Sequence, residues 1–252
     1  MLSLLKYFTK ETIEFIINFT NKTVEHYVNS EKLDIKKHEK ENDFPFYEFF
    51  KCDIKTMEIH LNGKTQKQYI SDSLWNIYRG TGGKTTPSLL QSIHMALEKF
   101  LLELAKSKES DVENLLIYIL KSSKSSSLTA IVNSVVLSNP NKYFNIAKIL
   151  FKTIELFPYD AKRSHIYEKE AETLYNIASM STNPIFIKER LDTCKDSHRK
   201  LVLGQLIIIY YFNLNNLVTE EELQERKTEI EKIIDFHYKQ LEEKRFRKRR
   251  KR

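Results

Sequence analysis

The stretch PSLLQSIHMALEKFLLELAK, Pro87 to Lys106, decides the fold class. Its aliphatic residues recur every three or four positions, which places them on one face of an α-helix. They are Leu89, Leu90, Ile93, Leu97, Leu101 and Leu104. Proline suits the first helical position, because its missing N–H would have no partner there. The pattern predicts a long amphipathic helix whose apolar face lies in a core.

Helical spacing recurs on both sides of this stretch, and the chain of 252 residues contains only five Gly and five Pro. That scarcity argues against a turn-rich β fold. One segment differs: TMEIHLNGKTQKQYI alternates apolar and polar residues around Asn62-Gly63, the strongest short hairpin signal. We therefore expect a mostly α fold, an irregular helical array or α-solenoid-like bundle without a clean internal repeat. It should contain one small β-hairpin, over about residues 56–70.

The net charge of +7 is confined to the C-terminal end of the chain. Residues 239–252 contain nine basic and two acidic side chains, which leaves residues 1–238 neutral. We expect residues 1–238 to form a single helical domain with a hairpin insertion, and residues 239–252 to form a basic tail. The tail has three interpretations: a solvated helix end, a contact for nucleic-acid phosphates, or a membrane-surface contact with Phe246 as its only apolar anchor. Its candidate polyanion contacts are Lys244, Arg245, Arg247, Lys248, Arg249, Arg250, Lys251 and Arg252.

The stretch YRGTGGKTTPS, Tyr78 to Ser88, contains the Gly-Lys-Thr that ends a phosphate-binding loop. That loop requires an earlier glycine, and Tyr78 occupies its position. The preceding segment is typical of a short capped helix with a tryptophan, whereas a phosphate-binding loop follows a buried strand. We expect a flexible connection here, no nucleotide binding and no cofactor.

No other motif in the sequence predicts catalysis. The seven histidines lack metal-ligand spacing, and Cys52 and Cys194 are too far apart for a metal motif or a disulfide framework. The most apolar run, residues 201–212, is shorter than the roughly 20 residues of a membrane helix. The N-terminus does not have the pattern of a signal peptide. We expect a cytoplasmic protein that is not an enzyme, with no metal site and no membrane span.

Four stretches together resemble a known family. They are TMEIHLNGKTQKQYISDSLWNIYRGTGG, PSLLQSIHMALEKFLLEL, LLIYILKSSKSSSLTAIVNSVVLSNPNKYFNIAKILF and DSHRKLVLGQLIIIYYF. They resemble the helical region downstream of the nucleotide-binding module in large bacterial STAND-type ATP-binding proteins linked to antiviral defence. The resemblance covers roughly residues 10–215. Its most specific element is Leu-Trp-x-x-Tyr-Arg-Gly-Thr, Leu74 to Thr81, with Trp75, Tyr78, Arg79 and Gly80 as candidate interaction residues.

The resemblance implies a role in sensing, or in transmitting the state of a sensor, through helical packing. Those proteins carry a Walker motif upstream, which this chain lacks, so the resemblance implies a fragment, a split subunit or a decayed gene. Its partner would be another protein or the remaining NTPase segment. The leading hypothesis is a non-catalytic helical interaction module. The alternative is a sequence-independent nucleic-acid-binding protein that uses its basic tail, and an enzyme of unrecognised type comes third.

Overall fold

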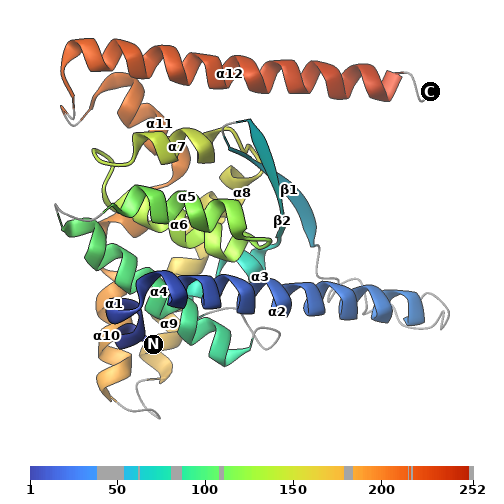
Figure 1. Ribbon diagram of the computed structural model, residues 1–252, viewed down its shortest axis with the longest axis vertical. Coiled ribbons are helices and arrows are strands. Elements are labelled where there is room, and N and C mark those ends of the chain that lie inside the picture. The colour runs from blue at the N-terminus through green and yellow to red at the C-terminus, as the bar shows by residue number, and fades with distance from the viewer. Residues whose placement is uncertain are drawn as a thin grey trace. The chain divides into compact units, whose positions relative to one another are not determined.

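The computed structural model describes residues 1–38, 54–61, 63–80, 87–107, 111–178, 184–214, 216 and 218–249. The described chain is mostly helical with one two-stranded antiparallel hairpin, so the expected fold class is confirmed (Figure 1). Its contacts form two compact units, each described by itself below. Unit 1 comprises residues 1–58 and 65–132, and unit 2 comprises residues 59–64 and 133–252. The single domain expected over residues 1–238 and the separate tail stay predictions.

Unit 1 is built mainly from helices. They are α1 (Leu2–Tyr7), α2 (Thr9–His38), α3 (Asp72–Trp75), the 3₁₀ turn η2 (Ile77–Arg79), α4 (Ser88–Lys106) and α5 (Val112–Ser122). Helix α6 (Ser126–Ser138) begins in unit 1, and the division between the units falls within it. Helix α4 is the one that the sequence predicts from its apolar stripe. Leu90, Ile93, Leu97 and Leu101 are buried, whereas Leu89 is 63% exposed and does not belong to that face.

The hairpin consists of β1 (Lys55–Leu61) and β2 (Lys64–Ile70), as expected. Met57, Ile59 and Leu61 are buried at alternate positions of β1, which is the pattern of a strand with one covered face. Gly63 in the turn has a φ of +74°, a left-handed conformation that glycine adopts without steric cost. Asn62, the other expected turn residue, lies outside the described residues.

A short capped turn follows the hairpin. The Ser71 side chain accepts a hydrogen bond from the backbone N–H of Leu74 at 3.2 Å, which caps α3. Gly80, with φ of +69°, ends η2 in the left-handed conformation. Trp75 and Tyr78 are completely buried, at 0% and 1% exposure, so this turn is anchored in the core of unit 1.

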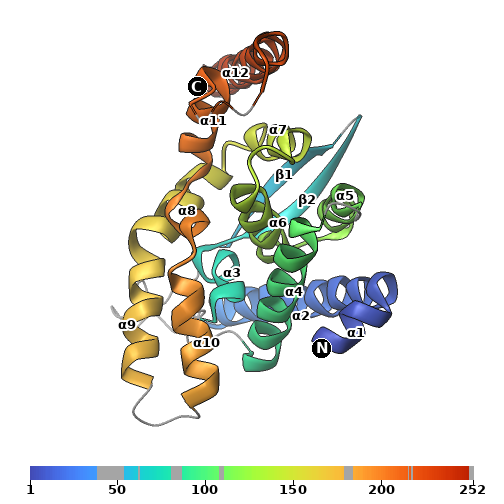
Figure 2. The ribbon, with the colours of Figure 1, turned by 90° about the vertical axis from the view of Figure 1, so that its left-hand side faces the viewer.

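Unit 2 contains the remaining helices. They are α7 (Phe144–Phe151), α8 (Leu156–Lys162), the π-helical turn η3 (Arg163–Tyr167), α9 (Glu168–Ala178), α10 (Pro184–Cys194), the 3₁₀ turn η4 (Ser197–Lys200), α11 (Leu203–Phe212) and α12 (Glu220–Arg249). Helices α8, η3 and α9 follow one another without a break, and α9 lies beside α10 (Figure 2). Helix α12 packs against α7 and α11.

Unit 2 is held together by buried ions at the start of its π turn. Asp160, fully buried, accepts hydrogen bonds from Asn133 Nδ2 at 2.6 Å, Arg163 Nε at 2.9 Å and the backbone N–H of Leu203 at 2.7 Å. Arg163 also donates to the carbonyl oxygens of Arg199 at 2.8 Å and of Leu201 at 2.6 Å. These bonds join η3 to the residues around η4 and to the start of α11. Because the Asp160 carboxylate and the Arg163 guanidinium each have several partners, these bonds offset the free-energy cost of removing the two charges from water.

Candidate functional site

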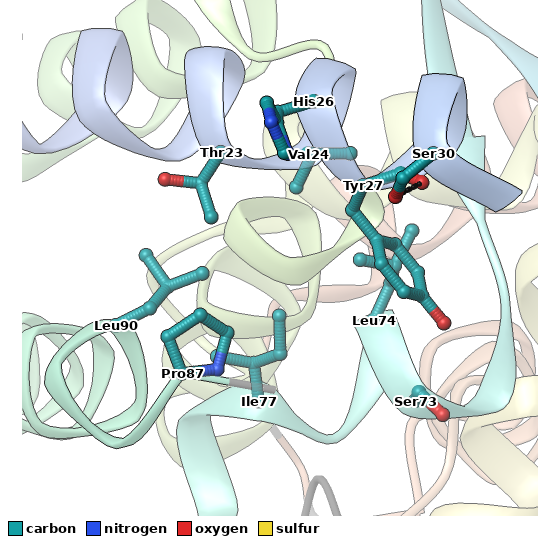
Figure 3. Close-up of a pocket in the computed structure, with 10 residues that line it drawn as sticks. All are labelled: Thr23, Val24, His26, Tyr27, Ser30, Ser73, Leu74, Ile77, Pro87 and Leu90. Carbon is teal, nitrogen blue, oxygen red and sulfur yellow. Dashed lines mark hydrogen bonds between the residues drawn. The ribbon is translucent and has the colours of Figure 1, made fainter. Parts of the chain in front are cut away.

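A small groove opens in unit 1 between α2 and the segment that runs from α3 to the start of α4 (Figure 3). Its volume is about 220 Å³. Helix α2 contributes Thr23, Val24, His26, Tyr27 and Ser30, which face Ser73, Leu74, Ile77, Pro87 and Leu90. We call this the unit 1 groove. Pockets for drug-sized ligands usually measure about 300–1,000 Å³, so this groove suits a group of the size of one side chain.

The floor of the unit 1 groove is a part of the core itself. Val24, Leu74, Ile77 and Leu90 line the groove and also form one buried cluster with Val28. Two hydroxyl groups at the rim are already engaged: Thr23 donates to the Phe19 carbonyl at 2.9 Å and Ser30 donates to the Tyr27 carbonyl at 2.8 Å. The groove therefore offers chiefly apolar contact, and its floor is fixed by packing.

None of the four candidate interaction residues lines this groove. Trp75, Tyr78 and Arg79 are buried, with no more than 2% of each exposed, and Gly80 is partly exposed at the end of η2. Leu74 and Ile77, from the same Leu74–Thr81 element, line the groove instead. The motif thus lies at a candidate surface, but its aliphatic residues reach that surface while its aromatic residues pack inward. That Trp75, Tyr78, Arg79 and Gly80 contact a partner stays a prediction.

A buried histidine lies in the core of unit 1. His94 is fully buried, and its Nε2 lies 2.9 Å from the hydroxyl oxygen of Thr20. Burial lowers the pKa of His94 from 6.5 to about 3, so the ring is neutral at physiological pH. Its Nδ1 has no hydrogen-bond partner among the described residues. The seven histidines lack metal-ligand spacing in the sequence, and His94 is a core residue of unit 1.

A second groove lies in unit 2, among α7, α8, α11 and α12. Its volume is about 390 Å³, and we call it the unit 2 groove. All but one of its lining residues are hydrophobic: Phe151, Ile154, Phe157, Ile207, Ile230, Ile233, Ile234 and His237. His237 Nε2 donates to the Phe151 carbonyl at 2.8 Å, which ties α12 to α7. Ile154 and Ile234 are 44% and 43% exposed, so apolar surface reaches solvent at the groove.

The basic tail begins on a helix. The backbone of α12 is helical through Arg249, so Lys244, Arg245, Arg247, Lys248 and Arg249 lie on two of its last turns. Arg250, Lys251 and Arg252 lie outside the described residues. The tail expected from residue 239 onward therefore starts as a direct continuation of α12.

The searches for metal and membrane features concern the described residues only. Within them, no three His, Cys, Asp or Glu side chains gather to hold a metal ion. No helix in the same ranges is long and apolar enough to cross a membrane. Cys194 is not in a disulfide within those ranges, and Cys52 and the Gly83-Lys84-Thr85 segment fall outside them.

Neither a protein-family model nor a curated protein matches the chain. The likeness to STAND-type proteins therefore rests on the four quoted stretches. From the sequence we singled out Trp75, Tyr78, Arg79 and Gly80, which do not line the unit 1 groove. The α2 side was missed, because Thr23 and Ser30 carry no motif. The apolar stripe of α12 is visible in the sequence and could have indicated the unit 2 groove.

Proposed function

We propose that this chain is a non-catalytic helical interaction and sensing module, a part or fragment of a bacterial antiviral STAND-type NTPase. The observation that carries the proposal is the position of Leu74 and Ile77, two residues of the Leu74–Thr81 element, in the wall of the unit 1 groove. The element that gives the resemblance its specificity also supplies Leu74 and Ile77 to an apolar surface. A module that recognises a protein partner by side-chain packing needs an apolar surface whose underlying residues are held rigidly.

The partner would be another protein or the remaining NTPase segment, and it would insert one apolar side chain into the unit 1 groove. The size of the groove favours a side-chain anchor over a drug-sized ligand. Anchors of this kind carry much of the binding energy of helix-in-groove complexes. Any ATP hydrolysis belongs, in this proposal, to the partner.

Photo-crosslinking in the source cell tests the proposal. A photoreactive amino acid is placed at Ser73, which lines the groove, or at Ser92, which is exposed on α4 and does not line it. We expect Ser73, and not Ser92, to capture a protein that carries a Walker motif. Equal capture at both positions would contradict a groove-specific partner. Capture of a protein without any NTPase motif would contradict the STAND assignment and leave the interaction module.

A groove-filling substitution sharpens this test. Thr23→Phe places a ring in the unit 1 groove, whereas Lys22→Phe adds the same ring at an exposed neighbouring position outside it. We expect Thr23→Phe to reduce capture at Ser73 at least tenfold and Lys22→Phe to leave it unchanged. Far-UV circular dichroism must show equal helicity in both variants, which separates a filled groove from a misfolded unit.

Sequence-independent binding of nucleic acid by the tail is the second candidate function. The helical backbone of α12 through Arg249 favours it, because five basic residues, Lys244, Arg245, Arg247, Lys248 and Arg249, then follow one another along a single helix end. Fluorescence anisotropy with labelled duplex DNA across a salt series is the test, with full-length chain and a chain lacking residues 245–252. Each phosphate contact contributes a slope of about −0.9 in log K against log salt. We expect weak binding that the truncation abolishes, and equal binding by both chains would place the site elsewhere.

A further inference from the structure

The apolar stripe of α12 changes from buried to exposed along the helix. Ile230 and Ile233 are buried, at 1% and 4% exposure. The next members of the stripe are exposed: Ile234 at 43%, Tyr238 at 64% and Leu241 at 49%. Their spacing of four and then three residues places these three side chains on one face. Figure 1 shows α12 continuing well past α11, in agreement with this change in exposure.

The basic end of α12 continues the same row. The helical backbone extends to the end of α12, so Arg245 and Lys248 follow Leu241 at spacings of four and then three residues. Residues 244–252 contain eight basic side chains and no acidic one. Clusters of roughly four to eight Lys or Arg on an amphipathic helix are typical of segments that bind anionic lipids. In the sequence, Phe246 is the only apolar residue within this basic end, and the structure adds the three exposed side chains that precede it.

We propose that the C-terminal half of α12 docks on the surface of an anionic phospholipid bilayer. Ile234, Tyr238 and Leu241 enter the boundary between headgroups and acyl chains, a depth that suits the apolar ring and polar hydroxyl of tyrosine. The basic residues that follow bind the lipid phosphates. Such a helix lies on a membrane, which is different from spanning it. This docking uses α12 alone, so it goes beyond the proposed function and does not depend on the unit 1 groove.

The apolar row selects a bilayer over a nucleic acid. Nucleic-acid phosphates would engage the basic end of α12 through its charge alone. The exposed side chains of Ile234, Tyr238 and Leu241 would then remain in water. A bilayer with anionic headgroups binds the basic end and also takes the apolar row out of water, so it complements both features of this helix.

The carboxylates of α12 lie away from this row. Glu231, the last glutamate of the first half of the helix, precedes Arg245 by 14 positions. That separation is about 21 Å along the axis, well beyond the screening length of about 8 Å at physiological salt. Glu243 is on the side of the helix opposite Ile234, and Asp235 and Glu242 are about a quarter turn from it. The row itself therefore presents apolar and basic residues to the bilayer.

Co-sedimentation of the full chain with vesicles is the first test. The vesicles contain phosphatidylcholine alone, or phosphatidylcholine with phosphatidylserine, and we expect binding to the second kind only. The double variant Ile234→Ser/Leu241→Ser should weaken this binding about tenfold, because it removes two side chains that leave water on docking. The matched control is Ile166→Ser/Leu174→Ser, at side chains 44% and 52% exposed outside α12, which should bind as the wild type does. Equal helicity by far-UV circular dichroism shows that both variants are folded.

Labelled duplex DNA is the parallel probe. If the full chain binds DNA but neither kind of vesicle, the basic end serves nucleic acid and the lipid docking is wrong. If it binds both probes, Ile234→Ser/Leu241→Ser should lose affinity for the vesicles alone, and an equal loss for DNA would overturn the proposal. Equal binding to vesicles with and without phosphatidylserine would also overturn it, as would equal weakening in the two double variants.

Quenching of fluorescence by brominated phosphatidylcholine tests whether the row enters the bilayer. Tyr238→Trp places an indole in the row, and Leu174→Trp places one at an exposed position of α9. The natural Trp75 is 0% exposed, so it supplies a constant background. On vesicles that also contain phosphatidylserine, we expect quenching in Tyr238→Trp and none in Leu174→Trp. Vesicle binding without quenching in Tyr238→Trp would show that the basic end adsorbs alone, and the docking of the apolar row would be ruled out.

Discussion

The two units differ in the buried polar pairs that hold them. Unit 1 contains neutral pairs, Thr20 with His94 at 2.9 Å and the Thr129 hydroxyl with the Gln68 carbonyl oxygen at 2.6 Å, although the charged side chains of Arg79 and Glu98 are buried there as well. Unit 2 contains an ion pair, with Arg163 Nε 2.9 Å from the Asp160 carboxylate and both side chains at most 2% exposed. Burying a neutral group costs less free energy than burying an ion. A buried ion that loses its partner therefore destabilises the folded state strongly.

This contrast teaches where each unit is vulnerable. Unit 2 should be sensitive to the loss of the Asp160 charge, since that carboxylate is the nearest counter-ion of the buried Arg163. Unit 1 should be sensitive to cavities and to the protonation of its buried imidazole. Trp75 is the only tryptophan and lies in unit 1, so its fluorescence reports on unit 1 while circular dichroism reports on both.

The largest expected effect is in unit 2. Asp160→Leu removes the carboxylate that lies 2.9 Å from the buried Arg163 guanidinium and leaves only that of Glu168, at 3.6 Å. The change should cost about 3 kcal/mol of the free energy of unfolding, the lower end of the range for a broken buried pair. Urea denaturation followed by circular dichroism measures it. The matched control is Asp192→Leu, which removes another i, i+3 pair, with Lys195, whose side chains are 55% and 75% exposed. That exposed pair should contribute less than about 1 kcal/mol. Equal losses in the two variants would break the contrast between buried ions and surface ions.

The corresponding test in unit 1 is Trp75→Ala. Trp75 is 0% exposed, so the substitution leaves a cavity and should cost about 3–5 kcal/mol, at the lower end because Nε1 has no partner among the described residues to lose. Thermal unfolding by circular dichroism measures the loss. Tyr7→Ala, at an aromatic residue that is 82% exposed, is the control and should change the melting temperature little. An unchanged melting temperature in Trp75→Ala would show that the site collapses around the missing ring.

The sequence predicted the elements better than it predicted the surfaces. The hairpin and the capped turn that ends at Gly80 were found because their signals are local: alternation in one strand, a serine cap and glycine turns. Leu89 was assigned to the buried face of α4 because spacing alone cannot show where a neighbouring helix ends. The hydrogen bonds that Asp160 accepts from Asn133 and from the Leu203 backbone were missed because they join residues 27 and 43 positions apart. The unit 1 groove was not predicted: Leu74 and Ile77 line it, whereas none of the four candidate interaction residues does.

Acid should act on unit 1 through His94. Its pKa is lowered in the folded protein to about 3, so the unfolded chain binds a proton at higher pH than the folded chain. The stability that this histidine contributes is therefore complete above pH 6.5 and declines as the pH falls toward 3, by about 1.4 kcal/mol per pH unit. We expect His94→Gln to flatten this slope, measured by urea denaturation with Trp75 fluorescence. His26→Gln, at an exposed position of α2, should retain it. Identical slopes in both variants would assign the acid sensitivity to another group.

The smallest effects come from two glycines of unit 2, and their signs should be opposite. A Cβ added at Gly63 or at Gly204 meets no atom within 4 Å, so only backbone conformation separates the two sites. Gly63 has a φ of +74°, which costs an L-residue about 1–2 kcal/mol, so Gly63→Ala should destabilise. Gly204 lies in the first turn of α11, and Gly204→Ala should stabilise by about 0.4–1 kcal/mol through the lower entropy of the unfolded chain.

Urea midpoints by circular dichroism should therefore move in opposite directions for Gly63→Ala and Gly204→Ala, and midpoints that move together would contradict the backbone argument. The same titrations, followed by Trp75 fluorescence, then show whether the two units unfold separately or together. If the fluorescence midpoint stays constant while the dichroism midpoint moves, unit 2 unfolds by itself, and its buried ions stabilise that unit alone. If both midpoints move together, the units unfold as one. The loss in Asp160→Leu would then appear in full in the fluorescence of unit 1, because a cooperative transition distributes every local loss over the whole chain.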